Sequence, residues 1–157
     1  MKFLITIALL IGLNTNSFAD VEDIIELREL YYSSTDSKIN TDKLVEYLKH
    51  ITLNSSPIHK GYKSMSFFLI SKHSLNPIDK LSFFKQGVKW LESSIKNNYN
   101  NIELRFLRFS VQNNSPLFLN YNNYIEDDRD YLVGNYKYLE DEDLKNRISN
   151  YLLLQTK

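Results

Sequence analysis

The chain contains no cysteine, and only four glycines and three prolines occur among its 157 residues. Without cysteine there is no disulfide, no thiolate metal site and no cysteine nucleophile, so the fold must rest on the packing of its core. Scarce glycine and proline mean few tight turns, and stretches of alternating β-branched and polar residues are scarce too. These shortages argue against a sheet protein.

The chain also lacks an excess of charge of either sign, because 19 basic residues balance 19 acidic ones. A neutral balance indicates neither a nucleic-acid partner nor an anionic membrane. There is no Gly-x-Ser-x-Gly elbow, phosphate-binding loop, dinucleotide fingerprint or His-Glu-x-x-His motif. The sequence therefore predicts no catalytic residue, metal or cofactor, and it favours a protein that is not an enzyme.

The longest apolar run, residues 3–13, has eleven residues, whereas a membrane-spanning helix needs about 20. A polar stretch follows and ends at Ser17-Phe18-Ala19, which has small residues where signal peptidase requires them. We expect a cleavable signal peptide over residues 1–19, a single helical domain over 20–157 and a periplasmic or secreted product with no membrane span. An uncleaved anchor is the rival interpretation.

Apolar residues recur at helical spacing along the rest of the chain. Ser56-Pro57 and Asn76-Pro77 each place a capping side chain before a proline at the first helical position. Asp20 is the expected cap of the first helix, and Asn40 or Thr41 that of the second. The predicted helices cover residues 21–32, 41–51, 57–74, 77–95, 101–112, 123–136 and 141–155, with a short helical turn after Ser115-Pro116.

These helices and their short polar links predict an all-α fold, either an antiparallel helix-hairpin array or an irregular bundle of about six to seven helices. The fourth helix has the most regular apolar stripe, which is typical of a helix that packs on a core. That stripe consists of Ile78, Leu81, Phe84, Val88, Leu91 and Ile95.

Gly87, Leu91 and Ser94, with residues 99–101 after them, resemble the second helix of a tetratricopeptide unit and its exit. The resemblance covers about twenty residues, and the neighbouring helices lack the Trp-x-x-Leu-Gly-x-x-Tyr pattern of that family. It implies tetratricopeptide-like helix pairing with a concave face.

A second resemblance rests on five short strings spread over most of the chain, at residues 61–63, 72–73, 76–77, 80–81 and 103–108. These strings are similar to a group of small exported helical proteins of Gram-negative bacteria. The group has no assigned activity, so the resemblance implies an exported helical protein and assigns no site.

Cations on the most apolar helices supply the candidate binding residues. Arg105 and Arg108 are three residues apart and project on one side of their helix. A charge on a buried helix must be paired or face a cleft, so these arginines either pair with Glu103 or the acidic run 126–130, or line a groove for an anion. The candidate binding residues are Tyr62, Lys63, Lys72, His73, Arg105 and Arg108.

Other polar features indicate no site. His59 and His73 are fourteen residues apart on one helix, about 21 Å, so they cannot share a metal. His50 and His59 flank one loop, but no carboxylate stands near them in sequence. The acidic run 126–130 lacks the ligand spacing of a calcium loop.

Eleven tyrosines exceed what a core of this size needs, so they either form contact surfaces or lie at core edges.

Three functions are compatible with these features. The favoured one is a non-enzymatic module that binds a protein or peptide in the periplasm or outside the cell, on a concave face between helix pairs. The second is a small-ligand binder for anions, or an enzyme, that uses the Lys/His/Arg set between the third and fifth helices. The third is an inhibitor or immunity-like protein that caps a secreted effector.

Overall fold

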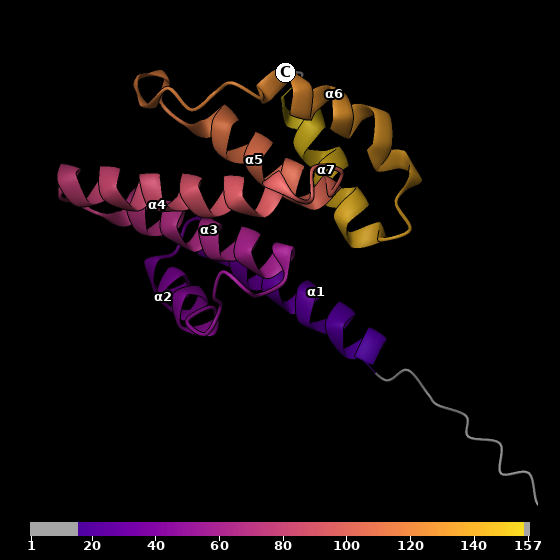
Figure 1. Cartoon of the computed structure of the whole chain (residues 1–157), viewed down its shortest axis with the longest axis horizontal. Coiled ribbons are helices and arrows are strands. Elements are labelled where there is room, and N and C mark those ends of the chain that lie inside the picture. Colours follow the sequence, from indigo (N-terminus) through magenta and orange to yellow (C-terminus); the bar gives the residue numbers. More distant parts are fainter. Residues whose placement is uncertain (1–15, 156–157) are drawn as a thin grey trace, which may run out of the picture.

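The computed structural model describes residues 16–155, so most of the expected leader lies outside the described residues. The described part contains seven α-helices, two short 3-10 helices and no strand, which confirms the all-α prediction (Figure 1). None of its helices is long and apolar enough to cross a membrane. The helices are α1 (Asn16–Ser34), α2 (Lys38–Tyr47), α3 (Pro57–His73), α4 (Pro77–Lys96), α5 (Ile102–Asn114), η1 (Leu117–Leu119), α6 (Ile125–Asn135), η2 (Tyr136–Tyr138) and α7 (Glu142–Leu154).

Local capping chemistry sets most helix starts. Ser56 accepts a hydrogen bond from the backbone N–H of His59 at the start of α3, and Asn76 accepts one from Ile78 at the start of α4. In each helix a proline fills the first position, where its missing N–H leaves no donor unsatisfied. These two caps are confirmed. Side-chain capping also sets the start of α5, where Asn101 is the cap, and the start of α7, where Asp141 is the cap.

Two predicted caps are wrong. Helix α1 begins at Asn16, so Asp20 lies inside the helix. At α2 the cap is Ser37, whose side chain accepts from the backbone N–H of Asn40. Thr41 lies one turn inside α2, and its buried hydroxyl donates to the carbonyl oxygen of Ser34 at 3.1 Å. The hydroxyl of Thr41 therefore ties α2 to the end of α1.

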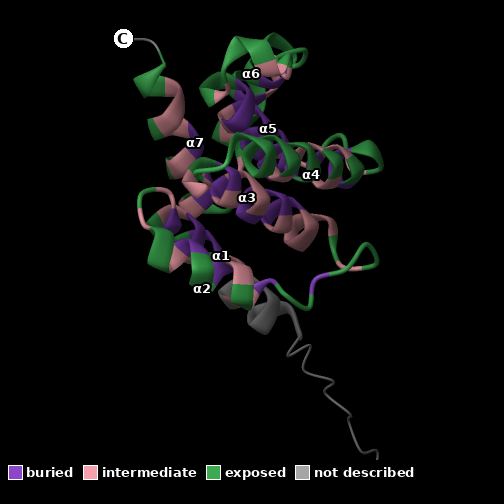
Figure 2. Ribbon diagram, turned by 90° about the vertical axis from the view of Figure 1, so that its left-hand side faces the viewer, coloured by how far each residue is buried: buried purple, intermediate pink, exposed green. Residues whose placement is uncertain are grey.

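Helix α5 runs between the other layers of the molecule. Figure 1 places α1 and α2 on one side, the paired α3 and α4 in the middle, and α6 and α7 beyond α5. Every residue from Glu103 to Phe109 is buried, as the purple ribbon of α5 in Figure 2 shows. Leu104 and Leu107 join the core shared with α1 to α4. Phe106 and Phe109 join a second core with α6 and α7.

Two glycines allow helices to approach closely around α3. A Cβ on Gly61 would lie 2.5 Å from the side chain of Leu104, so any larger residue there would require Leu104 to move. A Cβ on Gly87 would lie 2.8 Å from the ring of Phe68, so a side chain there would require that ring to move where α4 packs on α3. The small residue at position 87 thus has a packing reason, whereas tetratricopeptide-like pairing stays a prediction.

The apolar stripe of α4 is only partly inward. Phe84, Leu91 and Ile95 are buried as expected, but Ile78 is 77% exposed and Leu81 is 41% exposed. The first turns of α4 extend past the part of the helix that packs into the core, so one side of these turns remains uncovered. The prediction of an inward stripe is therefore wrong for the first turns of α4.

Candidate functional site

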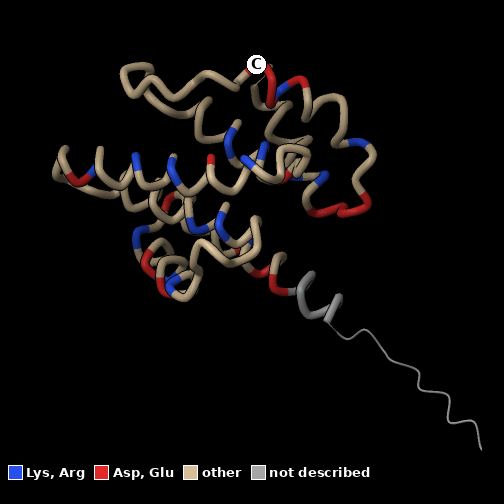
Figure 3. Tube along the Cα trace, viewed as in Figure 1, with Lys and Arg blue, Asp and Glu red and all other residues tan. Residues whose placement is uncertain are grey.

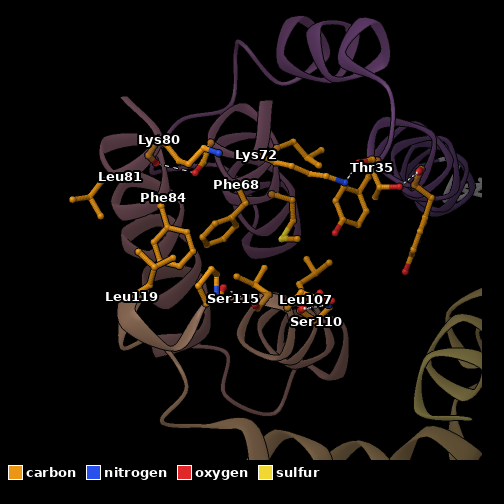
Figure 4. Close-up of a pocket in the computed structure, with 18 of the residues that line it drawn as sticks. Thr35, Phe68, Lys72, Lys80, Leu81, Phe84, Leu107, Ser110, Ser115 and Leu119 are labelled. Atoms are coloured by element: carbon orange, nitrogen blue, oxygen red, sulfur yellow. Dashed lines mark hydrogen bonds between the residues drawn. The ribbon is translucent and has the colours of Figure 1, made fainter. Parts of the chain in front are cut away.

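The uncovered side of α4 borders an apolar groove between α3, α4 and α5. The groove has a volume of about 660 Å³. Met65 and Phe68 of α3, Phe84 of α4, and Leu107 and Val111 of α5 form much of its surface. Figure 4 shows Phe68, Phe84 and Leu107 pointing into the space between the α3–α4 pair and α5. We call this site the α3–α5 groove.

Exposed apolar side chains continue from the α3–α5 groove onto the surface. Phe118 of η1 is 84% exposed and Leu81 of α4 is 41% exposed, and both line the groove. A second hollow of about 440 Å³ adjoins it and shares Leu81, Phe84, Phe118 and Leu119 with it. The two hollows therefore form one apolar trough, with Leu81 and Phe118 at the junction.

The charged side chains that line this trough are all basic. Lys72 and Lys80 line the α3–α5 groove and Lys85 lines the adjoining hollow, whereas neither hollow is lined by a carboxylate. Lys72 reaches the turn that follows α1, where its ammonium group donates to the carbonyl oxygen of Thr35 (Figure 4). The same ammonium group also donates to Asp36. A basic rim thus borders an apolar floor.

The six residues singled out from the sequence do not meet at one place. Only Lys72 lines the α3–α5 groove. The ammonium group of Lys63 donates to the carbonyl oxygen of Leu48 at 2.9 Å, and burial lowers its pKa. The Nε2 atom of His73 is buried and has no hydrogen-bond partner among residues 16–155. Tyr62 and the two arginines belong to separate ion-pair networks.

Arg105 and Arg108 converge on one carboxylate of α6. Their Nε atoms donate to the two oxygens of Asp128, each at 2.7 Å, and Asp128 is fully buried. Arg108 also pairs with Glu92 at 3.1 Å. Burial disfavours the charge of Arg108, but the bonds to Asp128 outweigh it and raise its pKa. These contacts support the interpretation that the arginines pair with the acidic run and hold α6 on α5.

Glu103, the other carboxylate considered for these arginines, is bound by Arg28 of α1 instead. The guanidinium of Arg28 donates from Nε and Nη2 to the two oxygens of Glu103, at 2.7 and 2.8 Å. Tyr62 donates its hydroxyl to Glu103 at 2.7 Å, and Arg28 also pairs with Asp141 at 2.8 Å. Sequence reasoning missed Arg28, because its partner is 75 residues away in the chain.

His59 has a carboxylate partner that its neighbourhood in sequence did not indicate. Its Nε2 lies 2.7 Å from Asp23 of α1, and its Nδ1 lies 2.6 Å from the hydroxyl of Ser56. These three residue types also occur in hydrolytic triads. Ser56 also accepts the backbone N–H of His59 as the cap of α3. The three side chains thus connect α1 to the start of α3.

Many of the surplus tyrosines cover these ion pairs. The guanidinium of Arg105 lies between the rings of Tyr99 and Tyr131, 4.5 and 4.0 Å from their centroids. Tyr124 stacks on Arg108 at 4.0 Å. Tyr121 donates its hydroxyl to Glu92 at 2.6 Å. These contacts favour a role at core edges over a role as a contact surface.

Within the described part of the chain, no three His, Asp or Glu side chains gather as a metal site would require. Comparisons with protein-family models, with curated proteins and with solved structures found no match.

Proposed function

We propose that the protein is a non-enzymatic binding module that takes the apolar side of a protein or peptide segment into the α3–α5 groove. The observation that carries this proposal is the open apolar trough, with Phe118 and Leu81 exposed beside it. Apolar surface left in water costs about 25 cal/mol per Å² relative to burial. Contiguous apolar patches on soluble proteins therefore mark sites where another molecule docks.

The anion-binding alternative has less support. An anion site needs donors that are free to turn toward the ligand, and the guanidinium groups of Arg105 and Arg108 are already used by Asp128 and Glu92. An inhibitor that caps a secreted effector is one kind of module that the proposal includes. The leader-like residues 1–19 support a place of action in the periplasm or outside the cell.

A single substitution at the edge of the trough tests the proposal. The probe is a fluorescein-labelled 18-residue helical peptide with a leucine face and glutamine on its other positions, and binding is measured by fluorescence anisotropy. Leu81→Asp places a charge at the junction of the two hollows and should weaken binding at least tenfold. The matched control is Leu53→Asp, because Leu53 is 60% exposed and lines neither hollow.

Leu53→Asp should bind the peptide within twofold of the wild type. The proposal is wrong if the wild-type protein does not bind the peptide, or if Leu81→Asp and Leu53→Asp bind it equally well. Melting curves of both variants check that the α3–α4 pair remains folded.

A further inference from the structure

Charge is strongly segregated along the chain although the total is neutral. Helices α3 and α4 contain seven lysines and only two carboxylates, Asp79 and Glu92. Glu92 is already engaged by Arg108 and Tyr121. Figure 3 shows blue positions along α4 and red positions concentrated in α1, α6 and the start of α7. The helix pair that borders the trough is thus the basic part of the molecule.

The lysines at the trough are not needed to complete the fold. Arg28, Arg105 and Arg108 bind the buried carboxylates Glu103 and Asp128. Lys72 pairs with Asp36, whose side chain is 92% exposed, and exposed pairs of this kind exchange easily. Lys80 and Lys85 make no ion pair with any residue between 16 and 155. Three ammonium groups therefore remain available to an incoming molecule.

We infer that the partner is an amphipathic helix of another protein, whose apolar face is flanked by Asp or Glu side chains. This inference rests on the proposed function and names the chemistry of the partner. The apolar face of such a helix would cover both hollows and the exposed Leu81 and Phe118 between them. A single acyl chain in one hollow would leave the other hollow uncovered. The flanking carboxylates would meet Lys72, Lys80 and Lys85.

Three matched peptides test the charge of the partner. They share the leucine face of the glutamine probe and differ only in the flanking positions, which are Glu, Gln or Lys. At 50 mM salt we expect the Glu peptide to bind about fivefold more tightly than the Gln peptide, because each exposed pair contributes a few tenths of a kcal/mol. The Lys peptide should bind most weakly. At 500 mM salt the three affinities should converge.

Reversing the charge of two lysines at the rim of the trough is the second part of the experiment. Lys80→Glu with Lys85→Glu should reverse the order, so that the Lys peptide binds most tightly. The control is Lys43→Glu with Lys137→Glu, which changes the net charge equally at exposed positions that line neither hollow. This control should keep the order of the wild type.

Each remaining outcome has a definite meaning. If the Glu and Gln peptides bind equally and Leu81→Asp abolishes both, the binding groove stands and the acidic partner is wrong. If none of the peptides binds, both proposals fail. If sodium oleate binds and no peptide does, the occupant is an anionic amphiphile, and the helix partner and the proposed function are both overturned.

Discussion

Asp128 offers the sharpest test of how the fold is held together. Its carboxylate is fully buried and accepts three hydrogen bonds from two guanidinium groups, at 2.7, 2.7 and 2.8 Å. Asp128→Asn keeps the shape of the side chain and removes its charge. The amide keeps one acceptor oxygen and loses the other. Arg108 then has Glu92 as its one remaining carboxylate partner among the described residues, and Arg105 has the backbone oxygen of Asp127 at 2.8 Å but no carboxylate. Two buried cations are left without adequate compensation.

The size of the effect follows from that loss. Removing one partner of a buried ion pair costs about 3–5 kcal/mol. For a domain of this size that cost corresponds to a fall in melting temperature of about 10–15 °C. Thermal unfolding followed by circular dichroism at 222 nm measures it. The matched control is Asp130→Asn, which makes the same change at an exposed position of α6 and should cost less than about 0.5 kcal/mol.

A third variant separates charge from packing. Replacing Arg105 and Arg108 with methionine and Asp128 with leucine removes the whole network and leaves no unpaired charge. Apolar replacement of a buried ionic set is often neutral or stabilising, so this variant should melt well above Asp128→Asn. The reasoning is refuted if Asp128→Asn melts within about 2 °C of Asp130→Asn, a difference worth under 1 kcal/mol.

Three further predictions concern the core and the pH dependence. Leu91→Ala, at a fully buried position, should cost about 2–5 kcal/mol in a denaturant titration, while Leu75→Ala, at a side chain 98% exposed, should cost almost nothing. Burial, and then the charge of Glu103, raise the pKa of Tyr62 well above its usual value. The stability of the protein should therefore decline as the pH rises above about 10. Tyr62→Phe should weaken that decline in melting curves between pH 8 and 11. The hydrogen bond from Tyr47 lowers the pKa of Asp23. The stabilisation that this carboxylate contributes should be present above about pH 4 and be lost as the pH falls. Tyr47→Phe should reduce that acid dependence in melting curves between pH 2 and 6.

The sequence by itself determined the helices and most of their ends. A cap depends on four or five consecutive residues, as at Ser56-Pro57 and Asn76-Pro77, so it can be predicted without any knowledge of distant contacts. The apolar content of α5 likewise indicated one of the most apolar helices of the chain. The pairing of Arg105 and Arg108 with the run 126–130 was one of two interpretations that the local pattern allowed.

Only the tertiary structure decided which distant groups meet. Asp23 and His59 are 36 residues apart, and Arg28 and Glu103 are 75 apart, so neither contact leaves a pattern in the sequence. The α3–α5 groove likewise arises from segments that are far apart in the chain. Periodicity assigns Leu81 to the same stripe as Leu91, but the position where α5 crosses the α3–α4 pair decides that Leu91 is buried and Leu81 is not. Helical spacing determines which residues share a face, and the packing of other helices determines how much of that face is covered.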